Sequence, residues 1–305
     1  MKYTVVLTAA YPPIAREILA GEFDVIEHPT EVERSEDEVI TILSEADAAI
    51  TLLSDPLTRR VLASNPNLRI IANHAVGYNN IDLDAARELG ITITNTPGVL
   101  TEATADFTMA LILAVTRRLV EGDREVRDTG RCIWEPLHLL GASLQDKRLG
   151  IIGLGRIGRA VALRAQAFGM NVTGVRRGDP LEQALEMSDI VSIHTPLTAE
   201  THHLIDAKAL ARMKRGAFLI NTARGPIVDE NALCDSLERG HLGGAALDVY
   251  EFEPAVNSRL LAMKNVVLTP HIGSATFETR NAMARIAATD VYRFLKGQAP
   301  LHRVT

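Results

Sequence analysis

The sequence contains few cysteines and few aromatic residues. Only 2 cysteines and 1 tryptophan occur among its 305 residues, and aromatic side chains make up 4%. Cys132 and Cys234 have neither a CxxC spacing nor a zinc-ligand spacing, which excludes a disulfide framework and a zinc module. We therefore expect two ordinary reduced thiols, no metal site and a cytoplasmic protein.

The chain also lacks long apolar runs, basic tracts and a leader pattern. No stretch approaches the about 20 apolar residues that a transmembrane helix needs, so no membrane partner is expected. The first residues lead directly into a strand pattern and are too short for a signal peptide. A net charge of -6, with both signs mixed along the chain, argues against a nucleic-acid-binding surface.

Length and composition indicate a globular protein of two domains. A chain of 305 residues exceeds a typical single domain, and 47% hydrophobic with 23% charged residues is an ordinary balance. Short apolar segments alternate with amphipathic helical segments, which predicts an α/β protein whose parallel sheets are covered on both faces. The expected strands are residues 3–7, 23–26, 48–53, 68–73, 91–94, 149–152, 171–175, 190–194, 217–221, 245–249 and 266–268.

The helical segments set the expected domain organisation. Ser35 and Asp82 are candidate N-caps of helices, and residues 128–147 lack a clean period, which favours an arm or a loop. We expect two doubly wound parallel-sheet domains with a cleft between them: a flavodoxin-like substrate domain of residues 1–98 and 286–305, and a Rossmann cofactor domain of residues 99–285. The expected helices are residues 12–20, 35–45, 82–89, one long helix over 101–127 that crosses between the domains, and 277–295.

A glycine-rich turn within residues 148–159 is the strongest local motif. An apolar strand pattern meets Gly153, Gly155 and Gly158, and a helical pattern follows. This order is typical of a dinucleotide site, in which the three glycines permit a sharp turn, approach of a pyrophosphate and close packing of the helix. The phosphates would bind free N–H groups at the helix start. The alternative is a glycine-rich turn without a ligand.

The second strand of that domain ends in Arg176 and Arg177. An acidic residue there would bind a ribose 2′-hydroxyl, whereas arginine favours a 2′-phosphate by its charge and its fork of donors. Asp179 lies past the strand and is interpreted as a turn residue. We therefore predict a preference for NADP(H), with NAD(H) possible; the alternative is that the two arginines are solvated surface charge.

Six separated motifs occur in one order along nearly the whole chain. They occupy residues 76–82, 149–158, 194–198, 221–225, 246–254 and 269–274. In these motifs the chain resembles the D-isomer-specific 2-hydroxyacid dehydrogenases, and within them the glyoxylate and hydroxypyruvate reductases. The resemblance implies an NAD(P)-dependent oxidoreductase that reduces small 2-keto acids to D-2-hydroxy acids.

By this resemblance three charged residues are catalytic, and each follows the end of an expected strand. Arg224 would bind the substrate carboxylate and polarise the carbonyl group, and His271 would be the general acid. Glu253 would lie beside that histidine and favour its protonated form. Glu251 is a rival for the last role; we choose Glu253 because the family's glutamate directly precedes a proline.

The resemblance also implies further binding residues. Val76 and Gly77 would offer backbone N–H groups to the substrate carboxylate, Asp248 would lie near the nicotinamide carboxamide, and Thr104 near the nicotinamide phosphate. Substrate contacts also include Arg224 and His271. The full set expected to bind the cofactor is Thr104, Gly153, Leu154, Gly155, Arg156, Ile157, Gly158, Arg176, Arg177, His194, Thr195, Pro196, Thr201, Thr222, Ala223, Arg224, Asp248, His271, Gly273 and Ser274.

Relatives form dimers through the region of residues 101–147, so the resemblance implies a homodimer. Trp134 lies in this region and would either reach the partner's substrate pocket or pack within its own arm. A larger keto acid of the phenylpyruvate class stays open as a substrate. The alternative function is a nicotinamide-binding regulator, like the corepressors built on this fold, and measurable turnover of 2-keto acids distinguishes the two.

Overall fold

The computed structural model describes residues 2–29 and 34–305, which divide into two compact units. Unit 1 comprises Met1–Leu100 and Ala275–Thr305, and unit 2 comprises Thr101–Ser274. The division along the sequence differs from the expected boundaries at 98 and 286. The reason is that helix α12 (Phe277–Leu295) packs along its whole length with unit 1, against α1 (Ile14–Leu19) and the sheet.

In the described residues of unit 1, five parallel strands form one sheet in the order β2-β1-β3-β4-β5. This order is that of a flavodoxin-like sheet, as the sequence predicted. In the register, Val5 lies opposite Val25 on one side and Ala48 on the other. The strands are β1 (Thr4–Leu7), β2 (Asp24–Glu27), β3 (Ala48–Thr51), β4 (Ile70–Asn73) and β5 (Thr92–Thr94).

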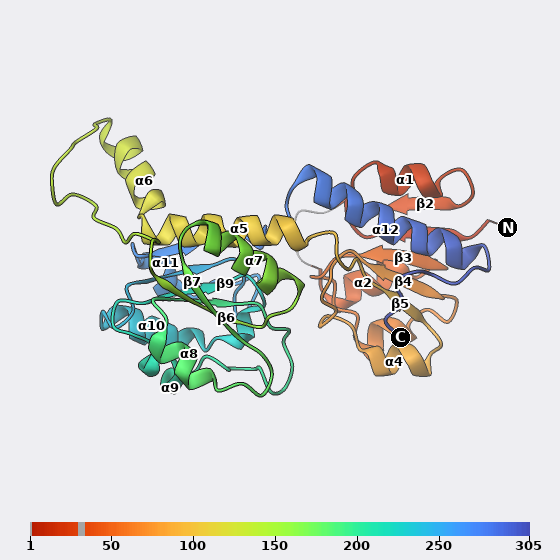
Figure 1. Cartoon of the computed structure of the whole chain (residues 1–305). Helices are drawn as coiled ribbons and strands as arrows, with labels where there is room; N and C mark the ends of the chain where they lie inside the picture. Colours follow the sequence, from red (N-terminus) through yellow and green to blue (C-terminus); the bar gives the residue numbers. More distant parts are fainter. Residues whose placement is uncertain (1, 30–33) are drawn as a thin grey trace. The chain divides into compact units, whose positions relative to one another are not determined.

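Helices cover both faces of this sheet (Figure 1). Val6 and Ile71 pack toward α2 (Glu36–Leu43), α3 (Arg59–Ala63) and α4 (Leu83–Glu88), whereas Leu7 and Ile70 pack toward α1 and α12. Successive side chains of a strand point to opposite faces, so strands buried on both sides have continuous apolar sequences. The two predicted N-caps are confirmed: Ser35 forms a capping box with Glu38, and Asp82 accepts the N–H of Ala85 at 2.8 Å.

Unit 2 contains, among its described residues, six parallel strands in the order β11-β10-β9-β8-β6-β7. From β6 the chain moves outward to β7 on one side and through β8 to β11 on the other, so the direction reverses between β6 and β8. Ligands of doubly wound sheets bind at such a point. The strands are β6 (Arg148–Ile152), β7 (Asn171–Val175), β8 (Ile190–Ile193), β9 (Phe218–Asn221), β10 (Gly244–Leu247) and β11 (Val266–Leu268).

Helices again cover both faces of the sheet, so the predicted fold class is confirmed. One buried cluster joins the strands to α5 and α7, and the other joins them to the helices that follow β7, β8 and β9. The helices of unit 2 are α5 (Thr101–Thr116), α6 (Leu119–Thr129), α7 (Arg156–Ala167), α8 (Leu181–Met187), α9 (Ala207–Arg212), α10 (Glu230–Glu238) and α11 (Ser258–Ala262).

The predicted single helix over residues 101–127 is wrong. The chain breaks at Arg118, whose φ of 53° lies in the left-handed region, and α6 starts in a new direction. The change in environment explains the break: α5 is largely buried, whereas α6 has no buried residue. We call residues 119–140 the arm, and it projects from the rest of unit 2 (Figure 1).

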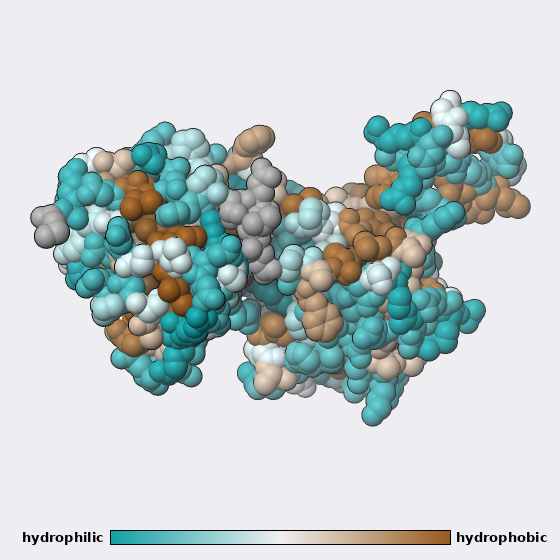
Figure 2. Space-filling model, turned by 180° about the vertical axis from the view of Figure 1, so that it is seen from behind, coloured by the Kyte–Doolittle hydropathy of each residue, from teal (hydrophilic) through white to brown (hydrophobic). Residues whose placement is uncertain are grey.

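The arm exposes apolar side chains to solvent, and Figure 2 shows some of them at its surface. Trp134 is 85% exposed, Leu137 82% and Leu119 63%. Such a patch on one projecting element is typical of an interaction surface. Among the described residues, no helix combines the length and apolar character that a membrane crossing requires.

Candidate active site

The glycine turn between β6 and α7 is built by close backbone contacts. Gly153 has a φ of 98°, which favours glycine, and a Cβ atom there would lie 2.7 Å from the carbonyl carbon of His194. A Cβ atom on Gly158 would lie 2.1 Å from the carbonyl oxygen of Gly153. Gly155 differs, because no atom outside its chain neighbours lies within 4 Å of its Cβ position. The turn is therefore tightly packed at two glycines and open at the third.

This open position lies at the start of α7. Gly155 is the N-cap and provides no side-chain hydrogen bond, so side-chain capping does not satisfy the first N–H groups of the helix. Free N–H groups and the positive end of the helix dipole favour an anion. Leu154 packs on β7, where a Cβ atom on Gly174 would lie 2.1 Å from its Cδ1 atom. The turn thus fits the pyrophosphate of a dinucleotide, with Arg156 exposed and Ile157 half-buried beside it.

The two arginines after β7 have different surroundings. Arg176 donates its backbone N–H to Asp179 at 2.7 Å, so that aspartate forms a turn, as predicted. The guanidinium of Arg177 lies 3.6 Å from Glu200. Within the described residues the Arg176 guanidinium forms no ion pair and is exposed. Arg176 is therefore the better placed of the two to bind a further anion.

The loop after β8 contains predicted cofactor residues that are held by local bonds. The Nε2 atom of His194 lies 2.8 Å from the hydroxyl of Ser192, and burial lowers the pKa of His194 to about 4. This ring is therefore neutral at pH 7. Thr201 donates its hydroxyl to the carbonyl oxygen of Pro196 at 2.7 Å and accepts an N–H of the same loop. Pro196 is exposed and Thr195 half-buried, so both are accessible to a ligand.

Arg224 follows β9 with a partly unsatisfied guanidinium. Asn221 donates to the backbone carbonyl of Arg224 at 2.9 Å and accepts the N–H of Ala223 at 3.0 Å, which shapes the loop. Nη1 of Arg224 donates to the carbonyl of Ala223 at 2.6 Å, but its buried Nε atom has no partner among the described residues. Burial lowers the pKa of Arg224, and the charge of Glu253 offsets this in part. A buried donor of this kind is suited to an incoming carboxylate.

His271 and Glu253 form a pair at the carboxyl ends of neighbouring strands. Nδ1 of His271 lies 3.0 Å from Oε2 of Glu253, whose Oε1 atom accepts the N–H of Tyr250 at 2.9 Å. Partial burial would raise the pKa of Glu253, but bonding to His271, its charge, the N–H of Tyr250 and the charge of Arg224 together lower it. The carboxylate of Glu253 is therefore ionised beside the imidazole.

Asp248 holds the loop that carries His271. Its carboxylate, on a residue only 1% exposed, accepts the hydroxyl of Thr269 at 2.7 Å and the N–H groups of Ile272 and Gly273, both at 2.8 Å. These bonds fix a loop in which His271 has a φ of 54°. The resemblance implied that Asp248 lies near the nicotinamide carboxamide. In the structure, both of its carboxylate oxygens accept hydrogen bonds from the loop after β11.

Close contacts join the loops of this edge to one another. A Cβ atom on Gly225 would lie 1.8 Å from the carbonyl carbon of Tyr250, so the loops after β9 and β10 touch backbone to backbone. The hydroxyl of Thr222 lies 3.1 Å from that of Thr108 on α5. Thr104 approaches the position of a Gly273 Cβ atom to 3.6 Å. The residue after Gly273, Ser274, is half-buried.

Other predicted residues lie elsewhere. Val76 and Gly77 belong to unit 1, in the loop after β4, where Asn95 and Asn73 bond their carbonyl groups. Trp134 lies on the arm. The rival Glu251 contacts His203, with Nε2 and Oε1 2.6 Å apart, and does not contact His271. His203 and Glu230, which bond to Glu251, belong to no sequence motif that predicted a role for them.

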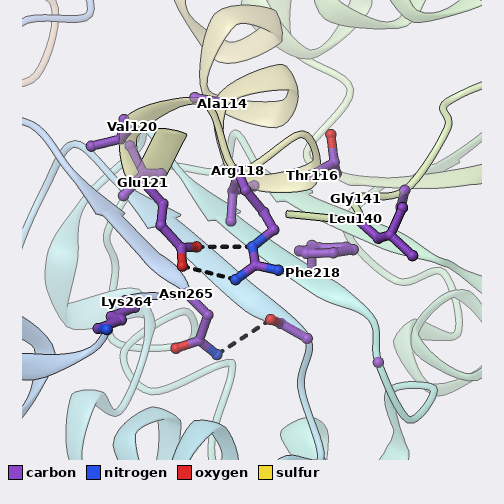
Figure 3. Close-up of a pocket in the computed structure, with 15 residues that line it drawn as sticks. Ala114, Thr116, Arg118, Val120, Glu121, Leu140, Gly141, Phe218, Lys264 and Asn265 are labelled. Atoms are coloured by element: carbon purple, nitrogen blue, oxygen red, sulfur yellow. Dashed lines mark hydrogen bonds and ion pairs between the residues drawn. The ribbon is translucent and has the colours of Figure 1, made fainter. Parts of the chain in front are cut away.

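A cavity in the described residues lies at the opposite edge of the same sheet. It has a volume of about 520 Å³ and is lined by the starts of β9, β10 and β11 and by the end of α5. Figure 3 shows the two-bond ion pair of Arg118 with Glu121 in it, and Asn265, which donates to Gly243 at 3.2 Å. None of the predicted site residues lines this cavity.

Comparison with known proteins identifies the family. Residues 109–273 match the family model described as the D-isomer specific 2-hydroxyacid dehydrogenase, NAD binding domain. The chain is 44% identical to a glyoxylate reductase of Korarchaeum cryptofilum, with 98% of this chain and 95% of the relative covered.

Two solved structures extend the match over the whole chain. The TT0316 protein from Thermus thermophilus has a TM-score of 0.93 and 44% identity, covering 99% of this chain and 100% of that one. An NADPH-dependent glyoxylate/hydroxypyruvate reductase from Sinorhizobium meliloti, in complex with NADP and malonate, has a TM-score of 0.86 and 31% identity, covering 100% and 97%. The chain therefore belongs to the D-isomer-specific 2-hydroxyacid dehydrogenases, which are NAD(P)-dependent oxidoreductases.

Proposed function

We propose that this enzyme reduces small 2-keto acids, glyoxylate and hydroxypyruvate first among them, to D-2-hydroxy acids with NADPH preferred over NADH. The observation that carries the proposal is the pair of His271 and Glu253 next to a loop whose Arg224 has a buried unpartnered donor. Glyoxylate reductases among the relatives support the substrate class. The exposed, unpaired Arg176 supports the choice of NADPH.

The chemistry assigns one role to each charged residue. Arg224 binds the substrate carboxylate and polarises the C2 carbonyl. Glu253 accepts Nδ1–H of His271, so Nε2 is the nitrogen that gives its proton to the carbonyl oxygen. The reduced nicotinamide supplies the hydride that reaches C2.

The remaining predicted residues bind the cofactor around this centre. The N–H groups at the start of α7 hold the pyrophosphate, and Arg176 holds the 2′-phosphate. The loops after β8 and β9 line the dinucleotide through Thr195, Pro196 and Thr222. We also propose a cytoplasmic homodimer assembled through residues 101–147, which the apolar surface of the arm supports.

The direct test is oxidation of NADPH and of NADH by the purified protein with glyoxylate, hydroxypyruvate and phenylpyruvate. We expect turnover of the two small acids, a lower KM for NADPH than for NADH, and a D-2-hydroxy acid product. Absence of cofactor oxidation with every 2-keto acid tested would contradict an enzymatic function and favour a nicotinamide-binding regulator.

Substitutions at the site test the assigned roles. His271→Gln should lower kcat by about 10²- to 10⁴-fold, the contribution of a general acid. Arg224→Gln should raise the KM for the keto acid as well as lower kcat, because the carboxylate loses its partner. The variant Arg215→Gln, exposed at the opposite edge of the sheet, is the control and should keep wild-type kinetics. A Trp134→Ala variant with altered KM for 2-keto acids would place Trp134 at a substrate pocket.

A further inference from the structure

Two glutamates behind the candidate active site hold one another's backbone. Oε1 of Glu230 accepts the N–H of Glu251 at 2.6 Å, and Oε2 of Glu251 accepts the N–H of Glu230 at 3.1 Å. Glu230 is the first residue of α10, and Glu251 lies in the loop after β10. This reciprocal pair, which we call the glutamate clamp, ties the segment after Arg224 to the segment before Glu253.

A third loop reinforces the clamp. Nε2 of His203 lies 2.6 Å from Oε1 of Glu251, and the N–H of His203 donates to the carbonyl of Pro226 at 2.9 Å. Two residues later, Ile205 forms a parallel bridge with Val228. The loop after β8 thus contacts both segments that the clamp joins. Glu251 is therefore bonded from two sides.

The clamp acts on the peptide groups that support the catalytic pair. The N–H of Tyr250 donates to Glu253, and the next N–H, that of Glu251, donates to Glu230. Two successive N–H groups of one loop are therefore occupied by two different carboxylates. Loss of the bond from Glu251 to Glu230 would let the peptide group between Tyr250 and Glu251 move. Glu253, which accepts the N–H of Tyr250, would then lose its fixed position beside His271.

The clamp contains a buried carboxylate, that of Glu230. Glu230 is 2% exposed, and its Oε2 atom has no hydrogen-bond partner in the part of the chain that the structure describes. Burial raises the pKa of Glu230; the N–H of Glu251 opposes this, and the charges of Glu251 and Glu253 add to it. The titratable and charged groups around the clamp are His202, His203, Arg224, Cys234, Tyr250, Glu251, Glu253 and His271.

We propose that Glu230 and Glu251 are positioning residues of the reduction: their reciprocal clamp orients the loop of Glu253 and, through it, the proton donor His271. This inference rests on the proposed function of the site. The clamp contributes geometry, so an uncharged acceptor at position 230 suffices. It does not touch the glycine turn or the end of β7, where the phosphates are proposed to bind, so we expect its loss to affect kcat before the KM for NADPH.

The test compares Glu230→Ala, which removes the acceptor, with Glu230→Gln, which keeps an oxygen for the N–H of Glu251 without the charge. Glu238→Gln, on the exposed side of the same helix, is the matched control. We expect Glu230→Ala to lower kcat about tenfold or more, with the KM for NADPH unchanged. Glu230→Gln and Glu238→Gln should stay within about twofold of the wild type.

Hydrogen exchange of the Glu251 amide in the whole protein supplies a readout that needs no activity. It should become faster in Glu230→Ala and stay slow in Glu230→Gln. Three results would overturn the proposal: equal kcat losses in both variants, a folded Glu230→Ala with wild-type kcat and exchange, or a parallel loss of NADPH binding. If the wild type reduces no 2-keto acid, the proposed function fails, while the exchange data still decide whether the clamp exists.

Discussion

At the candidate active site, some charged side chains form fewer hydrogen bonds than their polar atoms allow. Among the described residues, the buried Nε atom of Arg224 has no acceptor, and burial also disfavours the charge of its guanidinium. Protein interiors seldom leave a charged donor unpaired, because each such group costs free energy. An anionic substrate would repay this cost on binding. We therefore expect Arg224 to lower the stability of the free enzyme and, in its proposed role, to raise the affinity for a carboxylate.

The cofactor preference is tested at a single side chain. Arg176→Asp should raise the KM for NADPH by about tenfold or more and leave the KM for NADH unchanged or lower, because a carboxylate repels a 2′-phosphate and accepts from a ribose hydroxyl. Steady-state kinetics with both cofactors measures this. Arg177→Asp is the comparison variant and should raise the KM for NADPH less, since Arg177 already lies near Glu200. Equal changes in both KM values for Arg176→Asp would contradict the role of that arginine.

A buried histidine in unit 1 makes stability depend on pH. Burial, with the charge of Arg280, lowers the pKa of His74 from 6.5 to about 4. Between these values the unfolded chain binds a proton that the folded chain does not, so stability falls as the pH falls through this window. At pH 5 the part of this loss that comes from His74 should be about 2 kcal/mol relative to pH 7.

Urea unfolding at both pH values measures this loss. His74→Gln should remove the His74 share, about 2 kcal/mol, and leave a similar share from His194, whose pKa burial also lowers to about 4. The exposed control His202→Gln should retain both shares. A wild-type midpoint that does not change between pH 7 and pH 5 would show that His74 titrates at its ordinary value in the folded chain.

At the level of elements, substitutions at two glycines of the turn between β6 and α7 test cofactor binding and folding separately. The methyl group added by Gly155→Ala contacts no neighbouring atom, so the free energy of unfolding should fall by at most about 1 kcal/mol. The KM for the cofactor should rise, because the methyl group occupies the position where the phosphates are proposed to approach. Gly158→Ala meets the carbonyl oxygen of Gly153 and should destabilise the fold. Thermal unfolding and cofactor titration of both variants distinguish the effects. An unchanged cofactor affinity in Gly155→Ala would contradict a phosphate site here.

Local patterns predicted most elements because the forces that form them are local. Apolar runs of strand length, N-caps such as Ser35, and the glycines of the turn each occupy a few consecutive residues. The break at Arg118 could not be predicted in this way. Residues on both sides of it favour a helix, and only the burial of α5 and the exposure of α6 separate them.

At the level of the whole molecule, the apolar arm predicts self-association. Leu137→Glu should weaken the dimer about tenfold or more, because one buried leucine contributes about 1.5–3 kcal/mol to an interface. Leu163→Glu is the matched control, since Leu163 is 69% exposed on α7. Light scattering over a range of protein concentrations measures both. A monomeric wild type, or equal effects of the two variants, would contradict assembly through the arm.

The strands, most of the helices, the glycine turn and the motifs that contain Arg224 and His271 follow from the sequence alone, since each depends on neighbours in the chain or on a short motif, and the resemblance favoured Glu253 over Glu251. Tertiary structure decided which glutamate meets which histidine. Glu253 and Glu251 are two positions apart, yet one contacts His271 and the other contacts His203. These two contacts, and the clamp with Glu230, form where loops at one edge of the sheet touch. Such contacts produce no periodicity and no motif spacing in the sequence.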